Sequence, residues 1–191
     1  MLETEIIEDL QSKISPKRMQ HILGVVEAAE TLAKCYGEDI NKARIAALLH
    51  DCAKELKVKE MAKIIEKAGL LVDSEVLNNP ALLHGPAGAI LAVSFYGVED
   101  LDILEAIRVH TTGKVDMSRL DKIIFLADYI EKNRDFHGVE EMRKLAFIDL
   151  DKAVLAGYDS TISYLIEKKQ SIYSKTILGR NDIIFKIKNL R

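Results

Sequence analysis

The chain is poor in the two residues that interrupt secondary structure. Its 191 residues include 10 Gly and 3 Pro, about 7% of the chain, against about 12% in average usage. Because glycine and proline punctuate helices and strands, a chain that lacks them favours long, uninterrupted elements. The spacing of the apolar residues then decides which kind of element forms.

That spacing is helical. Between Pro16 and Tyr36 the apolar side chains recur at steps of three and four residues, as on one face of a helix. Ser15 is a favoured N-cap, Pro16 a favoured first helical residue, and Gly37 stands where a helix is expected to stop. The stripe consists of Met19, Ile22, Leu23, Val26, Ala29 and Ala33.

The same pattern recurs along the chain, whereas strict alternation is nearly absent. Only Lys186–Leu190 resembles a strand, and weakly. We therefore predict a single all-α domain of about eight helices over residues 1–191. Loops at 111–117 and 132–139 hold glycine beside charged residues and are candidate site loops. The further predicted helices are Asn41–Asp51, Val58–Ala68, Pro86–Tyr96, Asp100–His110, Ser118–Glu131 and Asp149–Lys169.

Charge and hydropathy limit the partners. A formal net charge of −3 and the absence of Trp argue against a general nucleic-acid binder. Apolar runs such as Ile123–Ala127 are too short to cross a bilayer. The acidic N-terminus does not resemble a signal peptide, and Cys35 and Cys52 do not form a disulfide framework. We expect a cytoplasmic protein without a stable nucleic-acid or membrane partner, and a homodimer remains open.

Four of the five histidines stand at or beside apolar helical segments. A single histidine in this position is usually a satisfied core residue, but four on separate helices that pack into one core indicate a shared site. Two acids share this context: Asp51 directly follows a histidine, and Asp128 lies inside the apolar segment Ile123–Ile130. A buried carboxylate is costly unless it is paired or bound to a cation. The four histidines are His21, His50, His84 and His110.

One metal ion relieves several of these costs at once. Imidazole and carboxylate ligands suit iron, manganese, zinc or nickel better than an ion that selects thiolates. Cys52 points about 100° further round the helix than Asp51. We therefore expect Cys52 to pack in the core and not to bind the metal.

Two cations are placed to bind phosphate. Lys54 follows His50 by one turn, so its ammonium can reach the edge of the metal site. Its alternative role is that of a solvated lysine that neutralises Asp51 or the helix end. Arg134 lies in the loop after the Asp128 helix, and a guanidinium binds phosphate bidentately. His137, in the same polar loop, is not expected to touch a substrate.

The ordered set of these histidines and aspartates resembles the HD-domain superfamily of metal-dependent phosphohydrolases, which are all-α proteins. The segments Leu48–Lys54, Leu83–Pro86 and Ile107–Gly113 resemble more narrowly the bacterial symmetrical dinucleoside tetraphosphate hydrolases. The likeness runs from about Ser15 to Ala146. We therefore expect a motif-bearing core at residues 15–146, followed by a C-terminal helix and tail at 147–191.

The resemblance implies cleavage of diadenosine tetraphosphate at its central phosphoanhydride into two ADP, by attack of metal-bound water. The cofactor it implies is one or two divalent or trivalent ions, foremost iron, with manganese, cobalt, nickel or zinc as alternatives. The implied metal ligands are His21, His50, Asp51 and Asp128. The implied catalytic residues are Asp51, Lys54, His84 and His110, and the implied substrate contacts are Arg18, Lys54, His84, His110, Thr111 and Arg134.

The resemblance leaves two matters open. His84 and His110 either hold a second metal, with Asp51 bridging, or bind phosphate oxygens beside a single metal. The family usually has proline after the glutamate at 131 and again at 137, where this chain has Lys132 and His137, so loop rigidity and substrate preference are in question. There are also two alternatives to the tetraphosphate hydrolase. One is an enzyme that acts on another nucleotide, such as a deoxynucleotide or a guanosine polyphosphate. The other is a metal protein that senses nucleotides without turnover.

Overall fold

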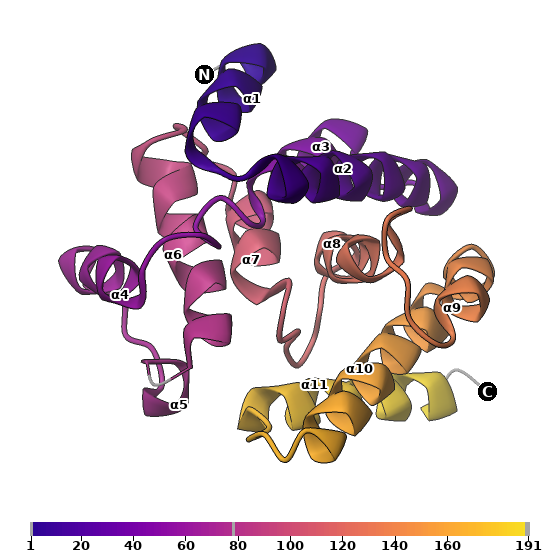
Figure 1. Cartoon of the computed structure of the whole chain (residues 1–191). Coiled ribbons are helices and arrows are strands. Elements are labelled where there is room, and N and C mark those ends of the chain that lie inside the picture. The colour runs from indigo at the N-terminus through magenta and orange to yellow at the C-terminus, as the bar shows by residue number, and fades with distance from the viewer. Residues whose placement is uncertain (1, 78, 190–191) are drawn as a thin grey trace.

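The computed structural model describes residues 2–77 and 79–189, which form helices and connecting loops with no strand (Figure 1). This confirms the predicted all-α fold. No helix in the described part is long and apolar enough to span a membrane. The helices are α1 (Glu3–Lys13), α2 (Pro16–Tyr36), α3 (Ile40–Leu49), α4 (Val58–Lys67), α5 (Ser74–Leu77), α6 (Pro80–Ser94), α7 (Leu101–Val109), α8 (Arg119–Ile130), α9 (Val139–Ala146), α10 (Leu150–Glu167) and α11 (Ser174–Asn189).

Helix α2 begins and ends as its sequence predicts. The Ser15 side chain accepts a hydrogen bond from the backbone N–H of Arg18, and Gly37 ends the helix with a left-handed φ of 66°. Of the predicted stripe, Leu23 is wrong, because it is 44% exposed. It lies about 100° round the helix from the fully buried Ile22, beyond the face that packs on α3 and α8.

Helix α6 begins six residues earlier than the sequence predicts. We expected its start at Pro86, but the helix starts at Pro80 and carries Pro86 in its interior. The reason lies in the residues that precede the two prolines. Asn79 caps the helix by accepting from the N–H of Ala81, whereas Gly85 has no side chain with which to cap. His84 therefore lies within a helix and not in a loop before one.

Three further predictions about the helices need correction: one helix end, one strand-like segment and the number of helices. The expected helix Asn41–Asp51 stops at Leu49, so that His50 is its C-cap and Asp51 lies in the following turn. The weakly strand-like segment Lys186–Leu190 is helical as far as Asn189, and Leu190 lies outside the described residues. Helix α11 forms because Ile183 is fully buried against the α10 side, which local alternation does not reveal. The described residues form eleven helices, more than the eight or so expected, and α1, α5, α9 and α11 are not among the seven helices whose bounds the sequence predicts.

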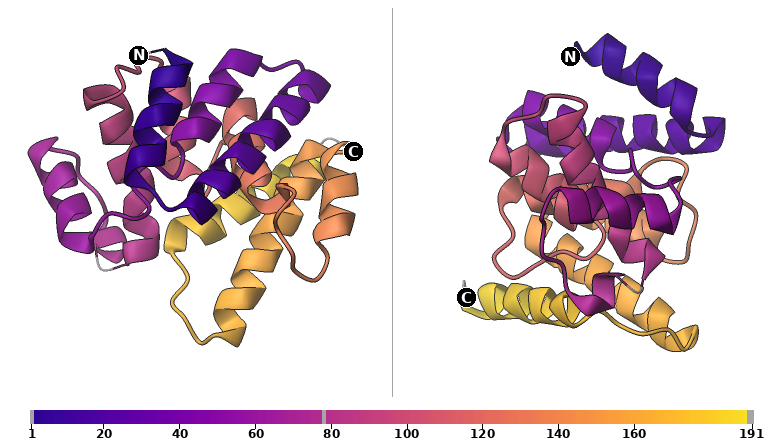
Figure 2. Two further views of the ribbon diagram at one scale, coloured as in Figure 1. Left: turned by 45° about the horizontal axis from the view of Figure 1, so that its top comes forward. Right: turned by 90° about the vertical axis from the view of Figure 1, so that its left-hand side faces the viewer.

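The helices are arranged so that several of them point at one place. Helices α2, α3, α7 and α8 pack on one another at the centre, with α6 beside α7 (Figure 1). Helix α1 lies at one edge of the molecule, and α10 and α11 lie at the opposite edge (Figure 2). Helices α3 and α7 both end on a histidine, and α2, α6 and α8 pass beside those two ends.

The close approach of α6 and α7 depends on Gly85. A Cβ at this position would lie 2.6 Å from the backbone oxygen of Arg108. We predict that Gly85→Ala lowers the free energy of unfolding by about 1–3 kcal/mol, although alanine is the better helix former. Thermal or denaturant unfolding measures this change.

Gly88, on the same helix, provides the matched control. A Cβ there would meet its neighbours at 3.5 Å or more, which is ordinary contact. Gly88→Ala should leave the free energy of unfolding unchanged or raise it by up to about 1 kcal/mol. Equal effects of the two substitutions would contradict the role given to Gly85.

Candidate metal centre

Asp51 lies at the centre of the histidine cluster. Its Oδ2 is 3.5 Å from His50 Nε2 and 3.7 Å from His21 Nε2. Its Oδ1 is 3.4 Å from His84 Nε2 and 3.6 Å from His110 Nε2. One buried carboxylate therefore faces two pairs of imidazoles from four different helices.

Three of the four imidazoles are held by their outer nitrogen. His50 Nδ1 donates to the carbonyl of Ala47 at 2.6 Å, and His110 Nδ1 donates to that of Ile107 at 2.7 Å. Because Nδ1 of each ring donates outward, Nε2 is the nitrogen that faces Asp51 and that a cation could use. Both histidines are C-caps of their helices, so each ring bonds to a carbonyl that its own helix leaves free.

Glu131 holds the third imidazole, and our sequence analysis did not single it out. This carboxylate is only 2% exposed and lies 3.2 Å from His21 Nδ1. Its other oxygen accepts from the backbone and side-chain nitrogens of Asn133. Gly24 admits it, because a Cβ at this point of α2 would collide with the Glu131 carboxylate. The available signal was an acid that directly follows the apolar helical segment holding Asp128.

The fourth ligand predicted from the sequence is Asp128 on α8. Its Oδ1 lies 3.1 Å from His21 Nε2. Burial alone would raise the pKa of this carboxyl, but the hydrogen bond to His21 and the charge of Arg134 hold it well below the usual value. Asp128 therefore offers an ionised carboxylate to the centre at neutral pH.

Burial and neighbouring groups also shift the pKa values of Asp51 and His84. Burial opposes ionisation of Asp51, yet His50 and His110 keep its pKa well below the usual value. Burial, with the nearby His110 and Lys54, holds the pKa of His84 well below the usual value, so that this imidazole is neutral. Anionic oxygens and neutral imidazole nitrogens are the donor set that a divalent cation prefers.

The spacing of these atoms also fits an ion. Bonds of about 2.1 Å to a shared metal place neighbouring ligand atoms roughly 3.0–3.4 Å apart. The His21 and His50 Nε2 atoms are 3.4 Å apart, and His21 Nε2 is 3.1 Å from Asp128. Asp51 Oδ1 is buried and receives no hydrogen bond from the described residues. These residues fit a metal ion, which supplies the positive charge that their arrangement lacks.

The predicted phosphate-binding side chains surround this centre. Arg18 donates to Asp51 Oδ2 at 2.7 Å, and Arg134 donates to Asp128, in part through its Nε at 2.7 Å from the carbonyl oxygen. Lys54 Nζ lies 3.1 Å from His84 Nε2, and burial lowers the pKa of this ammonium. The Thr111 hydroxyl lies 3.1 Å from His84 Nε2 and 3.0 Å from His110 Nε2. All ten predicted site residues thus meet at one place.

Two residues stay outside the centre, as the sequence predicts. Cys52 packs against the core, and its thiol faces the carbonyl of Gly88 at 3.7 Å. His137 is exposed in the loop between α8 and α9.

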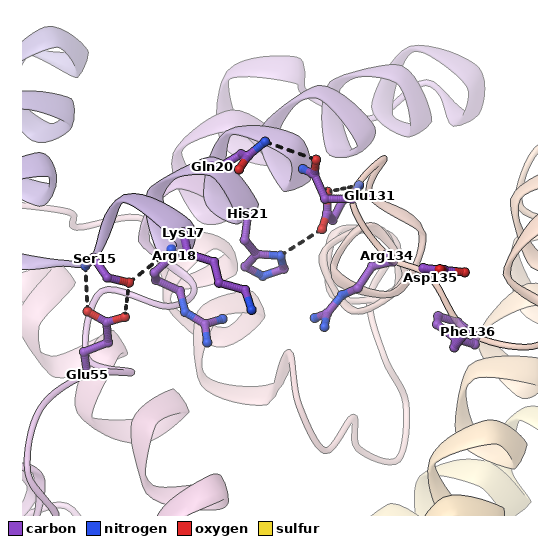
Figure 3. Close-up of a pocket in the computed structure, with 11 residues that line it drawn as sticks. Ser15, Lys17, Arg18, Gln20, His21, Glu55, Glu131, Arg134, Asp135 and Phe136 are labelled. Atoms are coloured by element: carbon purple, nitrogen blue, oxygen red, sulfur yellow. Dashed lines mark hydrogen bonds and ion pairs between the residues drawn. The ribbon is translucent and has the colours of Figure 1, made fainter.

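Two cavities border the centre. One, of 680 Å³, lies between the start of α2 and the loop after α8, with His21 and Arg134 in its lining (Figure 3). The other, of 390 Å³, lies between α8 and α10 and includes Asp128 and three aromatic rings in its lining. Both volumes lie within the range of about 300–1,000 Å³ that is usual for ligand sites.

The HD domain family matches residues 18–133, a range that holds all six residues of the histidine and aspartate cluster. The chain belongs to the HD domain family. Among solved structures, the HD domain protein from Clostridium acetobutylicum, described as a predicted HD superfamily hydrolase involved in NAD metabolism, is 45% identical with a TM-score of 0.95. The alignment covers 97% of this chain and 98% of that one.

Curated HD domain relatives are similar over nearly their full length. The symmetrical bis(5'-nucleosyl)-tetraphosphatase of Halalkalibacterium halodurans is 44% identical over 176 residues, which are 92% of this chain and 93% of that protein. The protein of the same name from Bacillus subtilis is 40% identical over 187 residues, which are 96% and 98% of the two chains.

The contact between Glu131 and His21 generates a prediction about metal affinity. Glu131→Ala removes the acceptor that fixes the His21 ring, and we expect metal affinity to fall by about 10–100-fold. Glu131→Gln keeps an acceptor oxygen and should restore part of the loss. Titration of Mn²⁺ into chelator-treated protein, against a competing dye, measures both.

A surface glutamate serves as the control. Glu27 forms an exposed ion pair with Lys132 and has a side chain that is 64% exposed, so Glu27→Ala should leave metal affinity unchanged. Wild-type metal affinity in a folded Glu131→Ala protein would show that Glu131 does not support the centre.

The two cysteines should differ in reactivity. Burial, followed by the charge of Asp51, raises the pKa of the Cys52 thiol to about 12, whereas Cys35 is exposed. At about pH 8, a thiol reagent should modify one cysteine per native chain quickly and both after unfolding. In Cys35→Ser, the fast phase should vanish. A fast phase that survives this substitution would mean that Cys52 is accessible.

Proposed function

We propose that this chain is a metal-dependent hydrolase that cleaves diadenosine tetraphosphate at its central phosphoanhydride to give two ADP. The observation that carries the proposal is the buried Asp51 carboxylate between two pairs of imidazoles, with cationic side chains at its edge. The relatives named symmetrical bis(5'-nucleosyl)-tetraphosphatase support the substrate, because they match this chain over more than nine-tenths of its length.

The ion is held by His21, His50, Asp51 and Asp128, and we propose that it is iron. Bound there, it supplies Lewis acidity and lowers the pKa of a coordinated water. Glu131 and the carbonyls of Ala47 and Ile107 fix the ring orientations of their histidines. Three of the imidazole rings are thus held in place before substrate arrives.

His84 and His110 bind phosphate oxygens and do not hold a second ion. The Thr111 hydroxyl lies within 3.1 Å of both inner nitrogens, and the Lys54 ammonium lies equally close to His84. Although Asp51, His84 and His110 lie close enough together to hold an ion, the two inner nitrogens already have these hydrogen-bonding neighbours. These donors converge instead on a place suited to a phosphate oxygen. One ion per chain is therefore expected by metal analysis, and two would contradict this assignment.

Cationic side chains stabilise the charge that develops during cleavage. Lys54 approaches Asp51 Oδ1 at 4.0 Å, so its ammonium lies beside the reacting phosphate in the proposed complex. Arg134 is 40% exposed and Arg18 is 28% exposed, so each has donors that face the cavities. Positioning and charge stabilisation carry most of phosphoryl transfer. These side chains therefore affect the rate as well as binding.

The cavity between α8 and α10 binds one adenine. Its walls carry the rings of Tyr129, Phe136 and Tyr164, and the hydroxyls of Ser160 and Thr161 lie beside them. Aromatic faces stack on a base, and hydroxyls bond to its edge or to the ribose. Lys132 and His137, where the family has prolines, lie in the loop after α8 that borders this cavity.

The sequence supports proposals about domain organisation, location and partners. We propose that residues 1–191 form one domain with its motif-bearing core at residues 15–146, located in the cytoplasm. Its partner is a small nucleotide, and nucleic acid and membranes are not among its partners. A homodimer is compatible with this function but is not required by it, since one chain carries the whole centre.

The reaction itself is the first test. Metal-loaded protein given a panel of nucleotides should convert diadenosine tetraphosphate into two ADP. Preferential hydrolysis of a deoxynucleotide or a guanosine polyphosphate would identify a different phosphohydrolase. Retention of ligand without product would identify a nucleotide sensor. Chromatography of the products separates the three outcomes.

Removal of the central carboxylate tests the site. Asp51→Ala and the isosteric Asp51→Asn should abolish hydrolysis and metal retention, while the helical circular dichroism spectrum survives. Asp102→Ala is the matched control, because that carboxylate is 65% exposed and pairs with Lys42 at the surface. Full activity of either Asp51 variant would refute the assignment.

A further inference from the structure

The cavity beside α2 borders the metal centre at His21, and the proposed function assigns no nucleoside to it. It is the larger of the two cavities at the centre, and it lies between the N-terminal turns of α2 and the loop after α8 (Figure 3). The hydrogen bonds from Ser15 to Glu55, at 2.6 and 2.7 Å, close one end. Phe136 lies at the other end.

The two cavities lie on either side of the metal centre. The cavity beside α2 borders the centre at His21, and the aromatic cavity borders it at Asp128. These two residues are in contact, with 3.1 Å between His21 Nε2 and Asp128 Oδ1. The cavities share only Arg134 and Phe136 among their described lining residues. A ligand that spans both cavities must therefore pass the centre at its middle.

The lining of the cavity beside α2 holds as many basic as acidic side chains, and two of its three acids, Glu55 and Glu131, are bonded to neighbouring groups. The side chains of Lys17, Arg18 and Arg134 point into the same space below His21 (Figure 3). Lys17 has no ion-pair partner among the described residues, and Arg18 Nε is buried without a hydrogen-bond partner. Gln20 and Asn133 add amide groups at the same wall. Because Arg18 and Arg134 also donate to Asp51 and Asp128, Lys17 and the Nε of Arg18 are the cationic donors left for a phosphate chain.

We propose that the cavity beside α2 is a second nucleotide subsite, which binds the other nucleoside diphosphate half of the substrate. This inference rests on the proposed function. A dinucleoside tetraphosphate has the same group at both ends, and cleavage at the middle requires one nucleoside diphosphate on each side of the ion. The aromatic cavity takes one half and the cavity beside α2 takes the other. Cleavage at the central bridge then follows from where the centre lies between the two subsites.

Lys17 gives the sharpest test, because it is exposed and lies only in this cavity. Lys17→Glu places an acid in the first turn of α2, where the helix dipole favours it, so the fold should persist. Lys34→Glu makes the same charge change on the same helix, at an exposed lysine outside both cavities. Thermal unfolding of both variants establishes that they are folded.

The measurement is the number of ADP molecules bound by the metal-loaded full chain in calorimetry, together with kcat/KM for diadenosine tetraphosphate. The wild type and Lys34→Glu should bind two ADP per chain. Lys17→Glu should bind one, with kcat/KM reduced by about ten-fold, as expected for the loss of one charged phosphate contact.

Two outcomes overturn the proposal while the proposed function stands. One is a wild-type enzyme that forms two ADP from the substrate but binds a single ADP. The other is a Lys17→Glu protein that matches Lys34→Glu in both measurements. A wild type that forms no ADP from diadenosine tetraphosphate refutes the proposed function, and the second subsite with it.

Discussion

Asp51 presents a buried carboxylate to four imidazole nitrogens, and much of the structure serves to keep it there. An isolated buried carboxylate is strongly unfavourable, so the fold must supply compensating charge around it. It does so with Arg18 on one oxygen and with histidines on both, and the second oxygen receives no hydrogen bond from any described residue. A cation at this place would complete the balance, because Arg18 pairs with only one of the two oxygens.

Two helix ends and two glycines position the side chains of the centre. His50 and His110 are C-caps, so the carbonyls left free by their own helices fix their rings. Gly85 allows α6 to approach the backbone of α7, and this brings His84 to within 2.9 Å of His110. Gly24 makes room on α2 for the Glu131 carboxylate. A glycine inside a helix costs about 1 kcal/mol relative to alanine, and here two of them secure contacts within the centre.

The two cavities give the centre its proposed selectivity. The one between α8 and α10 carries three aromatic rings, and the one beside α2 carries charged and amide side chains, so each can hold a nucleotide by a different balance of stacking and polar contacts. Arg134 lies at the junction and bonds to Asp128, which links the geometry of the loop after α8 to that of the ion. In this arrangement the bond that breaks is selected by its position between two subsites.

The sequence by itself determined the helical fold class and the cluster of metal-binding residues. Apolar spacing and capping residues such as Ser15 are local signals, and the cost of burying His50, Asp51 and Asp128 is evident from the apolar segments that hold them. Only the tertiary structure revealed Glu131, the start of α6 at Pro80 and the cavity beside α2. The start of α6 follows from a local difference, the capping side chain of Asn79, that the apolar pattern alone does not reveal, whereas the roles of Glu131 and of the cavity depend on residues distant in sequence. Such contacts are decided by how helices pack, which the periodicity of a single segment does not encode.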